Sequence, residues 1–170
     1  SVLLAMREVF AEHSPDAVLV HGDTTTTLAT AVAGFYAGVP VGHVEAGLRT
    51  HDVYAPFPEE FNRQVASKVT RWHFAPTALS RDNLMAEGVP ASSITVTGNT
   101  VIDALHWVLA RIYADTGRQV ALTEALHAVL PFDWPSHRFT LITGHRRENF
   151  GDGFVQICEA LRELALRFAD

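Results

Sequence analysis

The stretch AVLVHGDTTTTLATAVAGFYAGVPVGHVE, residues 17–45, decides the fold of this chain. An apolar run over residues 17–21 is followed by a helical pattern over residues 24–37 and by a second apolar run over residues 40–45. Glycines lie at both changes of pattern, where turns are expected. A strand, a helix and a second strand in this order predict two parallel strands joined by a right-handed crossover.

The same alternation continues on both sides of this stretch. Apolar periodicity predicts further helices over residues 2–13, 59–70 and 80–87 and further strands over residues 72–74 and 94–97. Alternating strands and helices of this length predict an α/β fold in which a doubly wound parallel sheet carries helices on both faces.

The pattern changes after residue 98. A predicted helix over residues 101–113 and a second helical stretch lead to LPFDWP, residues 130–135, whose two prolines and two aromatic residues suit an interdomain connection. A predicted strand over residues 139–142 and a helix over residues 154–168 then open a second α/β unit.

The domain organisation follows from this change. We predict residues 1–100 as the C-terminal part of a first domain, 101–137 as a helical interdomain connection and 138–170 as the start of a second, incomplete domain. Because one strand and one helix cannot close a core, we expect the chain to be a piece of a longer protein that supplies further strands to both domains.

Composition excludes several function classes. The chain has 170 residues, of which 48% are apolar, so it can bury a sizeable core. A net charge of −6 argues against a nonspecific grip on nucleic acid or anionic membranes. The single Cys158 excludes an internal disulfide framework and a cysteine-rich zinc site. No leader and no apolar run of membrane-spanning length occurs in the sequence, so we expect a cytoplasmic protein without membrane contact.

Polar side chains follow three of the predicted strands. Asp23 follows the first apolar run, Glu45 closes the second, and His145 follows the strand at residues 139–142. Ligands of open α/β sheets bind just beyond the carboxyl ends of the strands. Carboxylates at this place suit acid and base catalysis.

Each acid also has a structural alternative. Asp23 precedes a predicted helix and can serve as its N-cap. Glu45 can form a salt bridge with Arg49 or Arg63.

A second acidic group, Glu59 and Glu60, follows Pro58 at a predicted helix start. Acids are favourable there because of the helix dipole. Local sequence does not distinguish between the two glutamates.

Three further residues are candidates for substrate binding. Arg146 and Arg147 follow His145 in the most cation-rich turn of the chain, and such donors beside a helix N-terminus suit a diphosphate, although a solvated loop is the alternative. Asn99 lies in a turn after a strand and either serves the turn or reaches the cleft. The sequence contains no Gly-x-Gly-x-x-Gly and no Walker loop, so a dinucleotide or ATP cradle of the usual kind is not indicated.

Five segments taken together resemble the non-hydrolysing UDP-N-acetylglucosamine 2-epimerases. They are HGDTTTT (21–27), HVEAGLRT (43–50), PFPEEFNR (56–63), VTGNTVIDAL (96–105) and TGHRRENFG (143–151). The resemblance runs in order along nearly the whole chain. It implies a glycosyltransferase-B-like architecture, with substrate in the cleft between two Rossmann-like domains, and a homodimer of the full-length protein.

The resemblance also implies roles for single residues. It places catalytic carboxylates on Asp23, Glu45 and Glu59, and a catalytic or phosphate-contacting histidine on His145. It thereby favours the first glutamate of the pair over the second. Arg146 is similar to an arginine that contacts nucleotide sugar in bacterial members of the family.

The activity implied by the resemblance is the interconversion of UDP-N-acetylglucosamine and UDP-N-acetylmannosamine for cell-surface polysaccharide synthesis. UDP is eliminated to give 2-acetamidoglucal and is then added back, with no metal, nicotinamide or other cofactor. The alternatives are a hydrolysing epimerase that releases UDP and N-acetylmannosamine, a glycosyltransferase of the same architecture, and a non-catalytic nucleotide-sugar sensor. Because uridine-binding residues of the family lie largely in the second domain, we expect this chain alone to be inactive.

Overall fold

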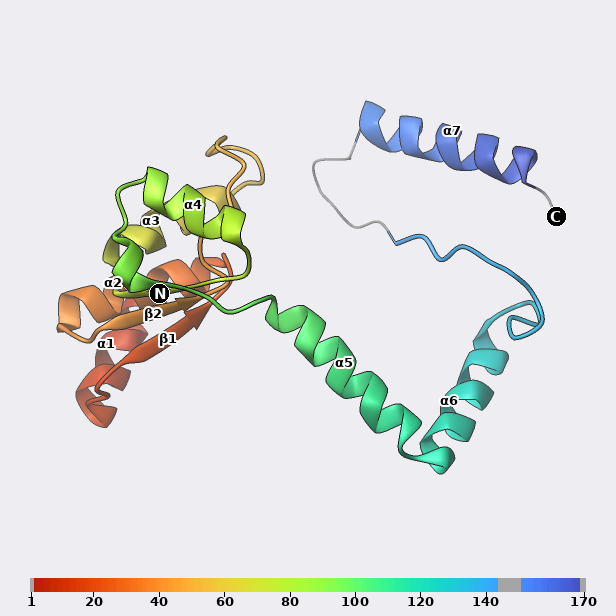
Figure 1. The fold of residues 1–170 in the computed structure, drawn as a ribbon, viewed down its shortest axis with the longest axis horizontal. Coiled ribbons are helices and arrows are strands. Elements are labelled where there is room, and N and C mark those ends of the chain that lie inside the picture. Colours follow the sequence, from red (N-terminus) through yellow and green to blue (C-terminus); the bar gives the residue numbers. More distant parts are fainter. Residues whose placement is uncertain (1, 144–150, 169–170) are drawn as a thin grey trace. The chain divides into compact units, whose positions relative to one another are not determined.

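The computed structural model describes residues 2–143 and 151–168. The chain divides into two compact units, Ser1–Arg111 and Ile112–Asp170. Figure 1 shows the helices and strands along the chain. Within the described residues, no helix is both long and apolar enough to pass through a membrane.

A parallel sheet of four strands forms the centre of the first unit. Its strands are β1 (Val18–His21), β2 (Val41–Val44), β3 (Trp72–Ala75) and β4 (Ile94–Val96). They lie in the order β1-β2-β3-β4, and Val20, His43, His73 and Ile94 are in register across them. The predicted parallel sheet is confirmed. Val20 and Val41 pack on Ala31 and Ala66 of the connecting helices at one face of the sheet, whereas Leu19 and Trp72 at the other face are exposed. The predicted helices on both faces are therefore not seen among the described residues.

The predicted helices of this unit are confirmed to within two residues. They are α1 (Val2–His13), α2 (Thr25–Ala37), α3 (Glu59–Val69) and α4 (Ala78–Ala86), with a short 3-10 helix, η1 (Ala91–Ser93), before β4. Helix α2 begins where Thr24 Oγ1 accepts the Thr27 N–H at 3.2 Å. It ends at Gly38, whose left-handed φ of 70° suits glycine.

Small side chains let α2 and α3 pack closely on the sheet. The buried core contains Val20 and Val41 from the strands and Ala31 and Ala66 from the helices. A Cβ atom on Gly34 would lie only 3.0 Å from Val41 Cγ2, so the helix cannot carry a larger residue there without a shift. This packing fixes the strand ends and the start of α3 relative to one another.

The second unit contains helices but no strand among its described residues. Helix α5 (Thr100–Tyr113) runs into it, and α6 (Thr116–Val129) and α7 (Asp152–Arg167) follow, as predicted. The predicted strand at residues 139–142 is wrong, because these residues have no β partner. A strand is stable only when a neighbour satisfies its N–H and C=O groups, which an apolar run cannot supply by itself.

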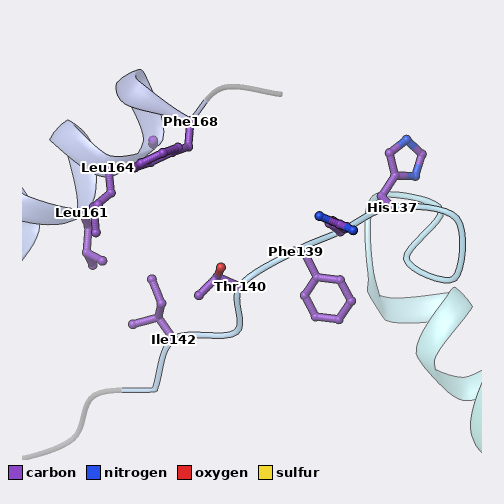
Figure 2. A pocket seen from close by; sticks show the side chains of 9 residues that line it. His137, Phe139, Thr140, Ile142, Leu161, Leu164 and Phe168 are labelled. Carbon is purple, nitrogen blue, oxygen red and sulfur yellow. The ribbon is translucent and has the colours of Figure 1, made fainter.

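The apolar segment before residue 143 lines an open pocket together with α7 of the same unit, and Phe139, Ile142 and Leu164 are each more than half exposed. Figure 2 shows Phe139 and Ile142 beside a pocket that Leu161, Leu164 and Phe168 also line. Apolar side chains from a segment and a helix are the components of an α/β core. The predicted domain boundaries stay predictions, and the division between the two units lies within α5.

Candidate active site

Asp23 lies just beyond β1 and is held by α3. Arg63 donates two hydrogen bonds to its Oδ2, from Nη2 at 2.6 Å and from Nε at 3.0 Å. Asn62 Nδ2 donates to the Asp23 backbone carbonyl at 2.7 Å. The alternative that Asp23 caps α2 is wrong, because Thr24 is the N-cap. The carboxylate of Asp23 therefore has no capping duty.

Glu45 directly follows β2 in a strained backbone conformation. Its φ is +70°, in the left-handed region, which costs a residue other than glycine about 1 kcal/mol. Its Oε2 lies 3.7 Å from His21 Nε2. Strain of this kind persists where the surrounding structure enforces it, and it is concentrated at functional sites.

The proposed salt bridges of Glu45 are absent from the described residues. Arg49 instead binds Glu87, with Nε at 2.6 Å from Oε1 and Nη2 at 2.9 Å from Oε2. Arg63 binds Asp23 and Glu60. The structural alternative for Glu45 is therefore wrong, since both arginines have other partners.

The turn after β1 brings Asp23 close to Glu45. Gly22 donates its N–H to Val44 O at 3.0 Å, and a Cβ atom placed on Gly22 would lie 3.5 Å from Glu45 Oε2. His43 holds the turn in place, because its Nε2 donates to Gly22 O at 2.7 Å. Burial lowers the pKa of His43, which keeps the ring neutral.

Glu59 and Glu60 have different surroundings. Glu60 is fully buried, and its oxygens accept hydrogen bonds from the Thr50 and His51 N–H groups and from the side chains of Arg63 and Gln64. Burial alone would raise the pKa of Glu60, but these four donors outweigh it and hold the pKa below its ordinary value. Glu59 is half-buried, and no described residue forms a hydrogen bond with its carboxylate.

Helical spacing places Glu59 on the side of α3 that meets Asp23. Asn62 and Arg63, which both bind Asp23, lie three and four residues after Glu59, and residues at these spacings share a helix face. The structure thus places Gly22, the residue before Asp23, beside Glu45. It places Glu59 on the same helix face as the two residues that bind Asp23.

Of the other predicted site residues, one lies in the turn before α5 and three lie outside the described residues. Asn99 caps the start of α5, where its Oδ1 accepts the Val101 N–H at 2.9 Å. The next residue, Thr100, has its Oγ1 3.3 Å from His21 Nε2, so this turn lies at the rim of the site. A substrate contact of Asn99 stays a prediction. The predictions for the cationic turn, His145, Arg146 and Arg147, lie outside the described residues.

The sequence did not indicate a role for Asn62 or His43, and Arg63 was considered only as an alternative partner of Glu45. The spacing of Asn62 and Arg63 from Glu59 shows that the three residues share a helix face. Their binding partner Asp23, which follows β1, is not visible in the sequence. Among residues 2–143 and 151–168, no three His, Cys, Asp or Glu side chains are grouped as metal ligands.

Comparison with known sequences gives concordant matches along the chain. The family profile described as UDP-N-acetylglucosamine 2-epimerase matches residues 1–170. A probable UDP-N-acetylglucosamine 2-epimerase of Ralstonia solanacearum is 51% identical over 170 residues, which are 100% of this chain and 44% of the relative. The UDP-N-acetylglucosamine 2-epimerase of Escherichia coli K12 is 51% identical over 169 residues, 99% of this chain and 44% of the relative.

Solved structures give the same result. The Neisseria meningitidis UDP-GlcNAc 2-epimerase bound to UDP-GlcNAc matches with a TM-score of 0.88 and 44% identity, over 99% of this chain and 44% of that one. The Methanocaldococcus jannaschii enzyme in complex with UDP-GlcNAc and UDP matches with a TM-score of 0.82 and 31% identity, over 99% and 44%. The chain spans less than half the length of these relatives. It belongs to the UDP-N-acetylglucosamine 2-epimerase family.

Proposed function

We propose that the whole protein interconverts UDP-N-acetylglucosamine and UDP-N-acetylmannosamine. The observation that carries this proposal is a set of three partly exposed carboxylates, two that follow the carboxyl ends of β1 and β2 and one at the start of α3. Glu45 Oε2 lies beside Gly22, the residue before Asp23, and Glu59 lies on the helix that holds Asp23. Membership of the family supports the choice of substrate.

Several acids suit this reaction because C2 of the sugar is hard to deprotonate directly. C2 lies next to an acetal carbon, not a carbonyl, so its proton is only weakly acidic. Elimination avoids the difficulty, since the C1–O bond to UDP breaks as a carboxylate removes the C2 proton. The products are 2-acetamidoglucal and UDP, and re-addition of UDP at C1 with a proton delivered to the other face of C2 gives the epimer. Carboxylates held on different elements can serve the two faces.

The departing diphosphate needs cationic donors. We assign this task to His145, Arg146 and Arg147, because Arg side chains bind phosphate oxygens in a bidentate manner and stabilise developing charge. The proposed ligands are UDP-N-acetylglucosamine and UDP. The Neisseria meningitidis relative was solved with UDP-GlcNAc bound, which supports this assignment. The reaction as written balances without a cofactor.

Product analysis of the whole protein tests the proposal. Incubation with UDP-N-acetylglucosamine should yield UDP-N-acetylmannosamine and an equilibrium mixture of the two nucleotide sugars. Release of UDP and free N-acetylmannosamine would instead identify a hydrolysing epimerase. Transfer of the sugar to an acceptor would identify a glycosyltransferase, and binding without conversion would identify a sensor. The 170-residue chain alone should show no turnover, and measurable turnover would contradict that expectation.

The proposal includes a homodimer of the whole protein in the cytoplasm. Exposed apolar side chains on the neighbouring helices α1 and α2, Leu4, Phe35 and Tyr36, support a contact between two copies. Exposed Cys158 is compatible with a reducing compartment. Light scattering should give twice the monomer mass for the wild type, and Tyr36→Glu should shift the equilibrium toward the monomer. A monomeric wild type would contradict the dimer.

A further inference from the structure

Arg63 connects two acids that differ in burial. Its Nε and Nη2 donate to Asp23 Oδ2, and its Nη1 donates to Glu60 Oε2 at 3.2 Å. The Arg63 side chain is only 13% exposed, whereas the Asp23 side chain is 29% exposed. The guanidinium therefore links a buried carboxylate to one that solvent and ligand can reach.

Glu60 fixes the position of this guanidinium. Its Oε1 accepts from the His51 N–H and Gln64 Nε2, and its Oε2 accepts from the Thr50 N–H as well as from Arg63. These donors come from the loop after β2 and from the next turn of α3, so Glu60 has little freedom to move. A planar guanidinium with all three nitrogens bound to two carboxylates has one orientation.

The consequence for Asp23 is an unequal pair of oxygens. Both Arg63 bonds end on Oδ2, and no described residue donates to Oδ1. Asn62 holds the backbone of the same residue through the Asp23 carbonyl. One carboxylate oxygen is thus used for positioning, and the other is available for a proton.

We propose that Arg63 is a positioning residue for the epimerase reaction, which holds Asp23 by Oδ2 so that Oδ1 faces the sugar, and that Glu60 anchors Arg63. This role rests on the proposed function of the whole protein. It goes beyond that function because it assigns different roles to the two carboxylate oxygens of Asp23. It also assigns roles to Arg63 and Glu60, which are not among the proposed catalytic residues. Misplacement of a reacting group by about 1 Å can lower a rate by about 100-fold.

A purely structural role makes a different prediction. If the ion pair only holds α3 against the sheet, loss of the fork should weaken folding and leave the kcat of the folded protein unchanged. A positioning role should lower kcat while KM stays the same, because Arg63 acts through Asp23 and leaves ground-state binding of the substrate intact.

The test is Arg63→Lys in the whole protein, with Arg49→Lys as the matched control. Lysine keeps the charge but cannot bind both carboxylates with a rigid fork. We expect kcat to fall about 10- to 100-fold with KM within about twofold of the wild type. Arg49 matches Arg63 because its buried guanidinium also donates two hydrogen bonds to a carboxylate, that of Glu87. Arg49 does not contact Asp23. Arg49→Lys should keep the wild-type kcat below its melting temperature.

A second variant covers the case in which Arg63→Lys does not fold. Glu60→Gln keeps the side-chain shape but removes the charge and one of the two acceptor oxygens that hold Arg63, so kcat should again fall while KM does not change. If Arg63→Lys folds and its kcat is unchanged, the positioning role is overturned. If Arg63→Lys does not fold, an unchanged kcat in Glu60→Gln overturns it. An equal fall in kcat in Arg49→Lys would also overturn it. Absence of epimerisation in the wild type would instead overturn the proposed function.

Discussion

Two sets of acidic side chains in the first unit differ in their surroundings. Asp23 and Glu45 follow the carboxyl ends of β1 and β2, Glu59 begins α3, and all three are partly exposed. Glu60 is fully buried, and Glu87 is partly exposed, but both oxygens of each of these two carboxylates accept hydrogen bonds. The second set is therefore committed to the fold. The first set retains oxygens for proton transfer.

The largest expected effect is on turnover. Asp23→Asn and Glu45→Gln should each lower the kcat of the whole protein by about 10²- to 10⁴-fold, because each replaces an acid or base by an isosteric amide. Because Asp23→Asn also weakens the ion pair with Arg63, urea unfolding should confirm that each variant is folded under the assay conditions, and Asp82→Asn, which alters an exposed pair with Arg81, is the control. Wild-type turnover in either site variant would show that the exposed acids are not the reacting groups.

The next effect is on stability and concerns the glutamate pair. Glu60→Ala should lower the free energy of unfolding by about 3 kcal/mol, since it removes a fully buried carboxylate and leaves the Thr50 and His51 N–H groups and Arg63 Nη1 without that acceptor. Glu59→Ala should lower it by less than about 1 kcal/mol. Urea unfolding of both variants measures the difference, and equal losses would remove the distinction between the two glutamates.

A third effect depends on pH and concerns the buried bases beneath the site. Burial, together with the neighbouring His43, lowers the pKa of His73 from 6.5 to about 4. Between these values the unfolded chain binds a proton that the folded protein does not. Stability is therefore fully present above pH 6.5 and falls by up to about 3 kcal/mol as the pH decreases toward 4. His73→Leu should flatten this decline, and an unchanged pH dependence of unfolding would contradict the assignment.

The smallest effect concerns the backbone of Glu45. At its φ of +70°, glycine should be more stable than alanine by about 1 kcal/mol. Thus Glu45→Gly should unfold at a higher urea concentration than Glu45→Ala, in reverse of the order usual in regular structure. The usual order, with alanine more stable, would show that the left-handed conformation at this strand end is not maintained.

Periodicity predicted the helices and the parallel strands of the first unit because these patterns are local. It also placed Asp23 and Glu45 at strand ends, since a strand that ends before a polar residue is visible in the sequence. The segment at residues 139–142 has the same apolar pattern but is not a strand. Strand formation depends on a neighbour, which the pattern does not report.

The distinction between Glu59 and Glu60 was not available from local sequence. It depends on the N–H groups of Thr50 and His51, which a loop brings to Glu60 from ten and nine residues away. The partner of Arg63 was not visible in the sequence for a related reason. Its partner Asp23 lies 40 residues earlier, and only the packing of α3 on the sheet brings the two together.

Exchange at C2 decides whether the exposed acids perform epimerisation. The whole protein, incubated with UDP-N-acetylglucosamine in deuterium oxide, should place deuterium at C2 of both nucleotide sugars. Asp23→Asn and Glu45→Gln should lose this exchange, while Asp82→Asn should retain it. Absence of deuterium at C2 in the wild type, or undiminished exchange in the two site variants, would contradict the assignment of Asp23 and Glu45 as acid and base groups.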